Sequence, residues 1–477
     1  MSAKKLPIEN LIDATAQRIN RSRNRAEPLY EQLADTFTDW ITGGNLGAGE
    51  RLPTHRELAS QLSINITTVT KAMAILQEAG LVESRPGRGT RVKLPVGQPQ
   101  AQFLSAPSDV PGLIDLSINR PATNAYSDFL PKLLPQLAAD PRFLFIQDYQ
   151  IPEGPLWARS AAQTWLGEQG IDTTSGQIII TEGAQHGIAC TLRALTQPGD
   201  TILTDSVTYQ GINALCHTLG LNIIGVNADT GGMCPKALEA ACTEHQPEAI
   251  FLVPSIQNPT TVTLSEHRRR ELAAIIKRFG LLLIEDDVYR PLLDTSPPPF
   301  AELLPDQTVY ITAMSKCIAP GLRMGFVVPP LKWQADISAT LRIDCWSTSP
   351  LSTLIASRLI EGGQASEMVA LQREELRARQ SILQELFVNL NVQSSATSPH
   401  AWLHLPDAWR ASSFAKACYE NGVSLLPGVA FTLRRESPPD AVRINLAAAR
   451  NRDQLVVGLS AIARLAQQGH LHMYDAV

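Results

Sequence analysis

From about residue 113 to residue 470 the chain repeats one pattern, in which a short apolar segment is followed by a polar turn and an amphipathic stretch. Six of the apolar segments are predicted strands, and they are QIIIT, TILTD, NIIGV, AIFLV, LLLIED and VYITA. Strands that alternate with helices form mostly parallel sheets covered by helices. Such sheets bind ligands at the carboxyl ends of their strands. The polar residues that follow each segment are therefore the first candidates for a functional site.

With 477 residues the chain is too long for one ordinary core, so two or three domains are expected. No apolar run approaches the ~18 residues of a membrane span, and the first residues lack the apolar segment of a signal peptide. The seven cysteines are odd in number and include no C-x-x-C pair. We expect reduced thiols in a cytoplasmic protein, with neither a disulfide framework nor a metal site.

The N-terminal part has a different pattern. Residues 28–41 have helical apolar spacing, and residues 54–62 form a short predicted helix with Thr54 as N-cap and a glutamate three positions later. Residues 63–80 predict a tight turn and a second helix that ends at a glycine. Residues 81–94 predict two short strands around Arg-Pro-Gly-Arg-Gly. The order is that of a helix-turn-helix followed by a β-hairpin wing.

A segment rich in proline, glycine and glutamine, residues 94–112, separates this head from the alternating body and is predicted to be a linker. Residues 1–93 hold 13 Lys/Arg and 10 Asp/Glu, a net charge of +3, so the remaining 28 and 36 give the rest of the chain −8. A basic head on an acidic body favours an anionic partner for the head alone. The excess is modest and by itself leaves nucleic acid an open question.

Residues 49–92 closely resemble the GntR-type winged helix, whose pattern Gly-x-Arg-Leu-Pro, Arg-x-Leu-Ala, Thr-Val, Gly-Leu and Gly-x-Gly-Thr stands here almost complete. The resemblance implies binding of double-stranded operator DNA, with the helix from about residue 66 in the major groove and the wing at the minor groove. The alternative is a basic domain that docks protein. The implied DNA-binding residues are Arg51, Arg56, Thr67, Thr68, Thr70, Lys71, Arg88 and Gly89.

Four motifs follow strands of the body: Gly-Ala-Gln from residue 183, Asn258-Pro259, Glu-Asp-Asp with Tyr289 shortly after it, and Ser-Lys at residue 316. Each is weak alone. The first is compatible with an ordinary strand-to-helix turn, the second with a simple turn, and the acidic cluster with a metal site or a solvated loop. A fifth motif, Gly-Leu-Arg-Met-Gly, comes shortly after the lysine.

Together the motifs match what pyridoxal 5′-phosphate requires, namely a lysine for a Schiff base, an acid at the pyridinium nitrogen, donors to the phenolic oxygen and a cationic fork for the phosphate. Their order resembles fold-type I aminotransferases, above all the branch with aminoadipate and kynurenine aminotransferases. The resemblance implies that Lys316 carries the Schiff base. It further implies cofactor-binding roles for Ala184, Gln185, Tyr209, Asn258, Asp286, Tyr289, Ser315 and Arg323.

Arg443, in AVRINLA, matches the family's arginine for a substrate or effector carboxylate, a role that suits the planar guanidinium. Three positions depart from the two family patterns. Ala313 stands where the aminotransferases usually have a phosphate-binding Ser or Thr, and strand alternation turns the adjacent Thr312 away. Thr261 replaces the usual glycine after Asn-Pro-Thr. Ile66 replaces an arginine of many winged helices, so base recognition there is expected to be apolar.

A GntR-type head joined to an aminotransferase-like body resembles the MocR-type transcriptional regulators. We expect a winged helix at residues 25–93, a linker at 94–112 and an α/β fold-type I domain at 113–475, with a smaller C-terminal part from roughly 350 to 475. The predicted function is a PLP-dependent regulator that senses an amine, an amino acid or PLP. The alternative is an active aminotransferase with a DNA-binding appendage. The family implies a homodimer, and no membrane partner is expected.

Overall fold

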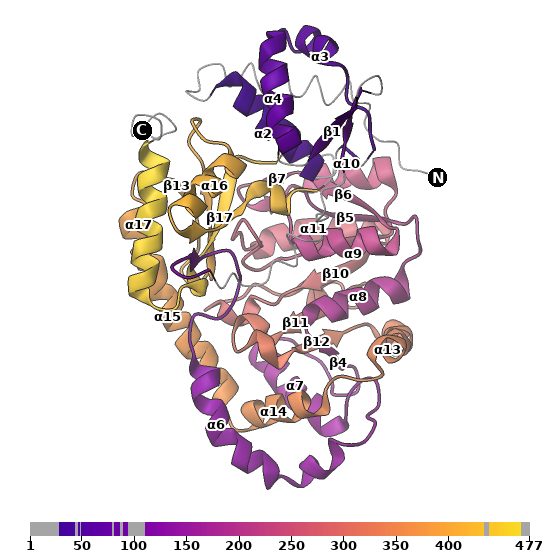
Figure 1. The fold of residues 1–477 in the computed structure, drawn as a ribbon. Helices are drawn as coiled ribbons and strands as arrows, with labels where there is room; N and C mark the ends of the chain where they lie inside the picture. Colours follow the sequence, from indigo (N-terminus) through magenta and orange to yellow (C-terminus); the bar gives the residue numbers. More distant parts are fainter. Residues whose placement is uncertain are drawn as a thin grey trace.

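The computed structural model describes residues 28–42, 46–47, 49–78, 81–85, 89–93, 110–433 and 438–468 (Figure 1). Its centre is a seven-stranded sheet, in the order β4-β12-β11-β10-β9-β5-β6. The strands are β4 (Ile179–Glu182), β5 (Thr201–Asp205), β6 (Asn222–Val226), β9 (Ala249–Leu252), β10 (Leu282–Asp286), β11 (Thr308–Ala313) and β12 (Met324–Val328). The six predicted segments are all strands of this sheet, within about two residues at their ends.

Strand β12 is the only member of this sheet that runs antiparallel to its neighbours, and the sequence analysis did not predict it. It lies between β4 and β11, with Gly325 paired with Ala313 on one side and with Thr181 on the other. The strand begins directly after Arg323, so it carries the Gly-Leu-Arg-Met-Gly motif to the same sheet edge as the other motifs. The sheet is mostly parallel, as predicted.

Helices cover both faces of the sheet. On one face α8 (Ala184–Leu195) and α13 (Leu331–Cys345) supply Ile188 and Leu341 to the main core. On the other, α10 (Pro235–His245) and α11 (Glu266–Phe279) close a second cluster. Further helices of this large domain are α6 (Ala125–Ala138), α7 (Leu156–Glu168), α9 (Gln210–Leu219), α12 (Phe300–Leu303) and α14 (Pro350–Glu361), with the 3-10 helices η1 (Pro141–Phe145), η2 (Arg290–Leu292), η3 (Met314–Lys316) and η4 (Pro320–Leu322). A short hairpin joins β7 (Ala228–Asp229) to β8 (Gly232–Met233).

The smaller C-terminal domain has its own core and its own antiparallel sheet, in the order β13-β14-β17-β16. The strands are β13 (Asn391–Gln393), β14 (His400–His404), β16 (Leu426–Pro427) and β17 (Ala441–Asn445), and β15 (Val423–Ser424) pairs with β3 (Ile114–Asp115). The helices are α16 (Ala411–Glu420), α17 (Arg452–Gln468), η5 (Gly428–Phe431) and η6 (Leu446–Ala448). Helix α15 (Gln364–Leu386) joins the domains, because Leu376 packs in the main core and Leu383 in the small one.

The head consists of α2 (Leu29–Thr42), α3 (His55–Gln61), α4 (Ile66–Glu78), and the antiparallel strands β1 (Val82–Arg85) and β2 (Gly89–Val92). Its apolar faces form a separate core. The predicted capping box is present, since Thr54 accepts from the backbone of Glu57 and the Glu57 carboxylate accepts from the backbone of Thr54. Most of the predicted linker, residues 94–109, lies outside the described residues.

The head lies at one end of the body (Figure 1), where α2 contacts α16 and Asp35 accepts a hydrogen bond from the Ser413 hydroxyl. Helix α16 in turn packs on β16, β17 and η5 of the small domain. Within the described part of the chain, no helix combines the length and the hydropathy that a membrane span needs.

Candidate functional site

A cavity of about 130 Å³ lies at the carboxyl ends of the central strands. Nine predicted site residues, contributed by five separate loops, line it together: Ala184, Gln185, Tyr209, Asn258, Asp286, Tyr289, Ser315, Lys316 and Arg323. Apolar side chains such as Ile188 and Val253 fill the wall between them. The parallel strand arrangement explains this convergence, because every motif follows the carboxyl end of a strand at one edge of the sheet.

One end of the cavity is suited to an anion. Helix α8 begins at Ala184, so the unpaired backbone N–H groups of its first turn face this region. Arg323 takes a left-handed conformation (φ 52°), which directs its guanidinium back toward β4, where Nη2 donates to the Glu182 carbonyl at 2.7 Å. A Cβ on Gly183 would lie 2.9 Å from Arg323 Nη2, so only glycine allows this close approach.

The side of the cavity is formed by Tyr209, which precedes α9. Its hydroxyl donates to Gln185 Oε1 at 2.9 Å, and Gln185 Nε2 donates to the Gly211 carbonyl at 3.3 Å. These two bonds fix the phenol ring at the cavity wall. A Cβ on Gly211 would come within 2.5 Å of both side chains, so glycine is required at that position too. The ring lines the cavity and also packs against the main core.

The acidic cluster after β10 divides into three separate functions. Glu285 accepts from the backbone N–H groups of Phe300 and Ala301, each at 2.9 Å, and faces Arg269. Asp287 pairs with a neighbouring buried arginine. Only Asp286 faces the cavity, and its Oδ1 has no partner among the described residues. Burial and the charge of Asp287 raise the pKa of Asp286 to about 7, although Lys316 opposes the shift.

Lys316 ends η3, directly after β11, and its Nζ donates to the Asn119 carbonyl at 3.0 Å. Burial and the charges of Arg443 and Arg323 lower the pKa of its amine to about 8, and Asp286 partly compensates. The lowered pKa increases the neutral fraction of the amine near physiological pH, and the neutral amine is the form that reacts with a carbonyl group.

Arg443, on β17 of the small domain, does not line the cavity itself but contacts Asn258, which does. Its Nη1 donates to Asn258 Oδ1 at 2.8 Å, and the guanidinium lies 4.8 Å from the centre of the Phe431 ring. Its Nε has no hydrogen-bond partner among the described residues, and burial lowers the pKa of Arg443 to about 10. A buried guanidinium that faces no carboxylate is costly without a ligand. Nη2 donates to the Ser117 carbonyl, so the Nε–H is the donor that is left for an external carboxylate among the described contacts.

Two residues that the sequence analysis missed connect the small domain to this site. The Asn119 amide donates to the Tyr289 hydroxyl at 2.5 Å and lies 3.4 Å from His400 Nδ1. His400 Nε2 donates to the Gln257 carbonyl at 3.2 Å, so Nδ1 is an acceptor. Burial lowers the pKa of His400 to about 3, which keeps the ring neutral. In the sequence, Asn119 is a single polar residue in the SINRP segment, far from the other motifs, and this gave little indication that it contributes to the site.

The departures from the family pattern have visible consequences. Ala313 is fully buried and offers no hydroxyl, and the Thr312 hydroxyl donates to the Asp287 carbonyl. Strand alternation thus turns Thr312 away from the cavity, as expected. Thr261 adopts a φ of 67°, the left-handed region that glycine favours, so the turn after Pro259 keeps a glycine-type conformation in spite of the side chain.

We therefore expect Thr261→Gly to stabilise the protein by about 1 kcal/mol, because a β-branched residue is strained at positive φ. Thermal or chemical unfolding of the two proteins measures the difference. Thr263→Gly, at a nearby position that is not among the residues with positive φ, is the control and should destabilise, because it also removes the hydroxyl that accepts from the Ile256 N–H at 3.0 Å. A loss of stability in Thr261→Gly comparable to that of the control would show that the turn is not strained.

One histidine, cysteine and aspartate group outside the cavity lies close enough for a metal: His186, Cys190 and Asp344. The backbone N–H of Glu182 donates to His186 Nδ1 at 3.1 Å, so the ring proton is on Nε2, which faces Asp344 Oδ2 at 3.2 Å. A protonated nitrogen cannot ligate a metal, and burial raises the pKa of Cys190 to about 12. The arrangement is that of a close histidine–aspartate pair and gives no support to a metal site.

The predicted DNA surface lies on the exposed side of the head. Helix α4 begins at Ile66, and the Asn65 side chain accepts from both the backbone and the hydroxyl of Thr67, at 3.0 and 2.9 Å. The Thr70 hydroxyl donates to the Ile66 carbonyl and lies 3.2 Å from His55 Nδ1. Thr67 and Thr70 thus already have local partners, whereas Ile66 is 41% exposed at the start of the helix.

The three cations Arg51, Arg56 and Lys71 are exposed and form no ion pair with a described residue. Thr68 is half-buried. Gly89 opens β2 with a φ of 76°, and a Cβ there would lie 3.1 Å from Arg51 Nε, so the wing and Arg51 are adjacent. Arg88, also predicted, lies outside the described residues.

Comparison with known proteins identifies both parts of the chain. Residues 111–462 match the family model described as aminotransferase class I and II, and residues 29–92 match the bacterial regulatory proteins of the gntR family. The HTH-type transcriptional regulator YdeF of Bacillus subtilis (strain 168) is 29% identical over 93% of this chain and 96% of its own length. The vitamin B6 salvage pathway transcriptional repressor PtsJ of Salmonella typhimurium (strain LT2) is 28% identical over 87% and 93%.

Among solved structures, the Pyrococcus horikoshii kynurenine aminotransferase superposes with a TM-score of 0.68 and 20% identity, covering 77% of this chain and 96% of that one. This likeness shows the fold of the body. The matches to relatives extend over head and body together, which no aminotransferase domain alone would explain. The chain therefore belongs to the aminotransferase class I and II family and joins to it a gntR-family winged helix, the architecture of the MocR-type transcriptional regulators.

Proposed function

We propose that this protein is a PLP-dependent transcriptional regulator that binds operator DNA through its head and senses an amine or amino acid through its body. The observation that carries the proposal is the convergence of Lys316, Asp286 and Arg323 on one cavity, in a chain that also has a winged helix. The relative PtsJ, a repressor named for vitamin B6 salvage, supports the link between this architecture and gene regulation.

The residues of the cavity fit pyridoxal 5′-phosphate. The free Oδ1 of Asp286 is an acceptor without a partner in the described chain, which suits a protonated ring nitrogen. The start of α8 with Ser315 and Arg323 suits a phosphate, and Tyr289 with Asn258 suits the phenolic oxygen. When bound, the cofactor supplies an aldehyde that combines with amines and a ring that withdraws electrons.

The chain's own groups explain how such a site would select its effector. Lys316 holds a partly neutral amine beside the ring position, and the Asn119 carbonyl orients it. Arg443 keeps part of its guanidinium unpaired, beside Asn258, for the carboxylate of an amino-acid effector. An amine without a carboxylate would leave Arg443 unpaired and bind less tightly.

The head would contact DNA mainly through backbone phosphates. Arg51, Arg56 and Lys71 have no competing ion pairs among the described residues, so they are available to phosphate oxygens. Ile66 at the start of α4 offers an apolar surface suited to a thymine methyl group. Thr67 and Thr70 could contribute only by exchanging their present local hydrogen bonds.

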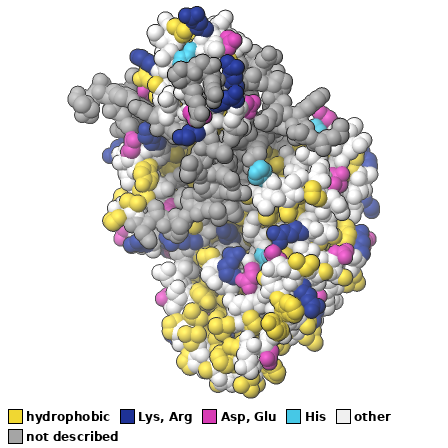
Figure 2. Space-filling view, turned by 45° about the vertical axis from the view of Figure 1, so that its right-hand side comes forward, with side chains coloured by type: hydrophobic (Ala, Val, Ile, Leu, Met, Phe, Trp, Pro, Cys, Tyr) yellow, Lys and Arg dark blue, Asp and Glu magenta, His cyan; other side chains and the backbone are white. Residues whose placement is uncertain are grey.

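A homodimer is also part of the proposal. Hydrophobic side chains gather at the lower end of the body (Figure 2), the end of α6 and α14 in Figure 1. Exposed apolar residues between α6 and the start of α7 are Leu134, Phe143, Leu144, Phe145, Tyr149, Ile151 and Leu156. A surface of this kind on a protein of this family favours burial against a second copy.

The second candidate, a working aminotransferase with a DNA-binding appendage, is favoured by the complete set of polar residues in the cavity. The two functions are separated by a steady-state assay with 2-oxoglutarate and a panel of amines, run beside an operator-binding assay. We expect operator binding that responds to an amine, with at most slow turnover. Fast turnover together with operator binding that no amine changes would favour the enzyme.

A further inference from the structure

A second cavity, of about 600 Å³, lies between the large and small domains of the body. Gln257 lines this cavity and the next residue, Asn258, lines the cofactor cavity, so the two spaces are neighbours across one short segment. Val253 borders both. Neither Lys316 nor Arg443 lines the second cavity, and the proposed function does not use it.

The second cavity contains a buried carboxyl group. Asp205 is the last residue of β5 and is only 8% exposed. No described cation forms an ion pair with it. Burial raises the pKa of Asp205 to about 7, and a hydrogen bond with Gln257 partly opposes the shift. A buried carboxylate gains most from a partner that brings a positive charge.

An aromatic side chain of the small domain lines the same cavity. Trp402, on β14, is 2% exposed and lines the cavity, and its ring is held edge-on by Phe431 and His404, with ring centres 5.9 and 6.3 Å away. An indole face attracts an organic cation, and burial strengthens that attraction. Apolar side chains, those of Met233, Leu252, Val253 and Leu264, form another part of the wall, beside polar residues such as Asn227 and Asn391.

The wall next to the cofactor cavity is rigid. The Gln257 amide donates to the Val207 carbonyl at 2.7 Å, and its oxygen accepts from the backbone and hydroxyl of Thr260 at 2.8 and 2.6 Å. Each of these bonds fixes the side chain between two loops of the large domain. The cavity is thus preformed, which lowers the cost of binding a ligand.

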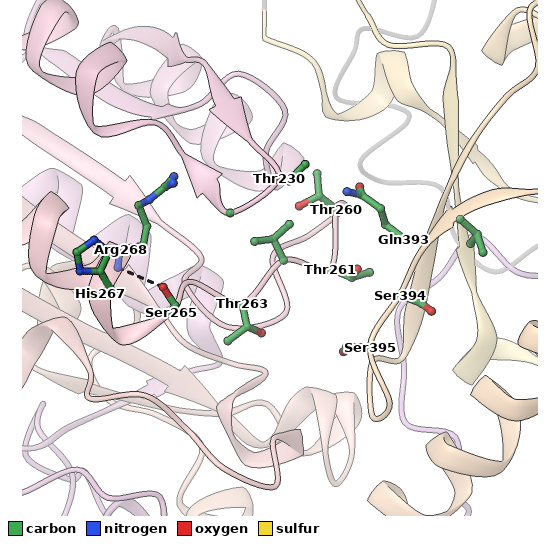
Figure 3. A pocket seen from close by; sticks show the side chains of 13 residues that line it. Thr230, Thr260, Thr261, Thr263, Ser265, His267, Arg268, Gln393, Ser394 and Ser395 are labelled. Carbon is green, nitrogen blue, oxygen red and sulfur yellow. Dashed lines mark hydrogen bonds between the residues drawn. The ribbon is translucent and has the colours of Figure 1, made fainter.

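An outer groove of about 470 Å³ shares Thr230, Thr260, Val262 and Gln393 with the cavity and leads outward from it. Figure 3 shows Thr230 and Thr260 of the large domain opposite Gln393 of the small domain. The hydroxyl groups along the groove belong to Thr230, Thr260, Thr261, Thr263, Ser265, Ser394 and Ser395. Its arginine, Arg268, is bound bidentately by Asp229 at 3.0 Å, so its charge is already paired.

We propose that the cavity between the two domains binds a small organic ammonium ion, with its charge between Asp205 and Trp402 and any polar tail in the hydroxyl-rich groove. The carboxylate supplies charge, the indole a cation-binding face and the apolar wall room for a carbon skeleton. Because the ligand would contact both domains and the segment next to Asn258, its binding would favour one arrangement of the domains. This site needs neither Lys316 nor the cofactor.

The test is calorimetric titration of the full-length, cofactor-loaded protein with benzyltrimethylammonium, a quaternary ion that cannot react with an aldehyde. We expect binding by the wild type and by Lys316→Ala with similar affinity. Asp205→Asn should weaken it at least about tenfold, and Trp402→Leu by about 3- to 30-fold. Asp172→Asn, which removes an exposed carboxylate far from the lining residues, should bind like the wild type. Benzyl alcohol, which carries no charge, should not bind.

A pair of variants at the exposed Thr230 makes the test independent of the buried core. Thr230→Arg should weaken binding of the ion by charge repulsion, and Thr230→Asp should preserve or strengthen it. The proposal is overturned if the wild type does not bind the ion, or if binding is lost in Lys316→Ala. The proposal is also overturned if folded Asp205→Asn binds the ion with wild-type affinity. The same holds if Thr230→Arg and Thr230→Asp both bind it with wild-type affinity.

Discussion

Replacing Lys316 by alanine is expected to abolish the covalent attachment of the cofactor and its visible absorption, and with them the response of DNA binding to an amine that acts through the cofactor cavity. Lys316 is the only lysine that lines the cofactor cavity of the described chain, and its amine has a pKa lowered to about 8. Alanine removes that amine but leaves Asp286, Tyr289 and the start of α8 in place. The cofactor should therefore still bind weakly, without a link that borohydride can reduce.

Absorption spectra before and after borohydride treatment measure this prediction. Lys277→Ala, an exposed lysine on α11, is the matched control and should keep the wild-type spectrum. If Lys316→Ala still becomes covalently labelled on reduction, a different lysine holds the cofactor. Retained cofactor with no covalent label is the result that the geometry of the cavity predicts.

The second large effect is expected in the head. Replacing Arg56 and Lys71 together by alanine should weaken operator binding strongly and leave the cofactor content unchanged. Both side chains are exposed and form no ion pair with a described residue, so their charges are available to phosphates. Each lost phosphate contact should reduce the slope of log affinity against log salt by about 0.9, so the double variant should lose about 1.8.

Binding measured over a range of salt concentrations tests this directly, again with Lys277→Ala as a control for charge alone. An unchanged slope would place the DNA surface on another face of the head. A reduced affinity with an unchanged slope would indicate loss of folding or of base contacts, which the melting temperature of the variant distinguishes. The third predicted cation, Arg51, lies beside Gly89 of the wing and would extend the same surface.

Much of this architecture follows from local sequence patterns. Four of the predicted strands are followed by a motif, and in a parallel sheet those ends meet at one edge, so the convergence of Asn258, Asp286 and Lys316 was predictable. The capping box at Thr54 was also predictable, because its hydrogen bonds join residues only three positions apart. Strand β12 was missed because its MGFVV segment was interpreted only as the continuation of an arginine motif.

The remaining features depend on how distant segments pack. Asn119 meets Tyr289 across 170 positions and His400 across 281, and no local pattern marks either contact. The cavity at Asp205 is lined by residues of both domains, with Trp402, Asn391 and Gln393 contributed by the small domain. The conformation of Thr261 also had no reliable local signal, because threonine rarely takes a positive φ. Such features depend on contacts between segments that are far apart in the sequence, and these contacts leave no local sequence pattern.

We propose that occupancy of the body changes the affinity of the head for DNA. A structural route exists, because Arg443 lies on β17, β17 and η5 pack on α16, and α16 contacts α2 of the head. A coupling free energy of about 1–3 kcal/mol would change operator affinity by about 5–150-fold, and operator DNA must change effector affinity by the same factor. In Arg443→Ala, a far higher concentration of an amino-acid effector should be needed to produce the same change in operator affinity.

The most direct measurement is operator affinity with and without each member of a panel of primary amines and amino acids, for the wild type and for Lys316→Ala. We predict that at least one ligand changes the operator affinity of the wild type by about 5–150-fold. The operator affinity of Lys316→Ala should not change when the same ligand is added. The reciprocal titration, effector binding with and without operator DNA, should give the same factor. An equal response in Lys316→Ala would contradict the account, since the body would then sense its ligand without the lysine.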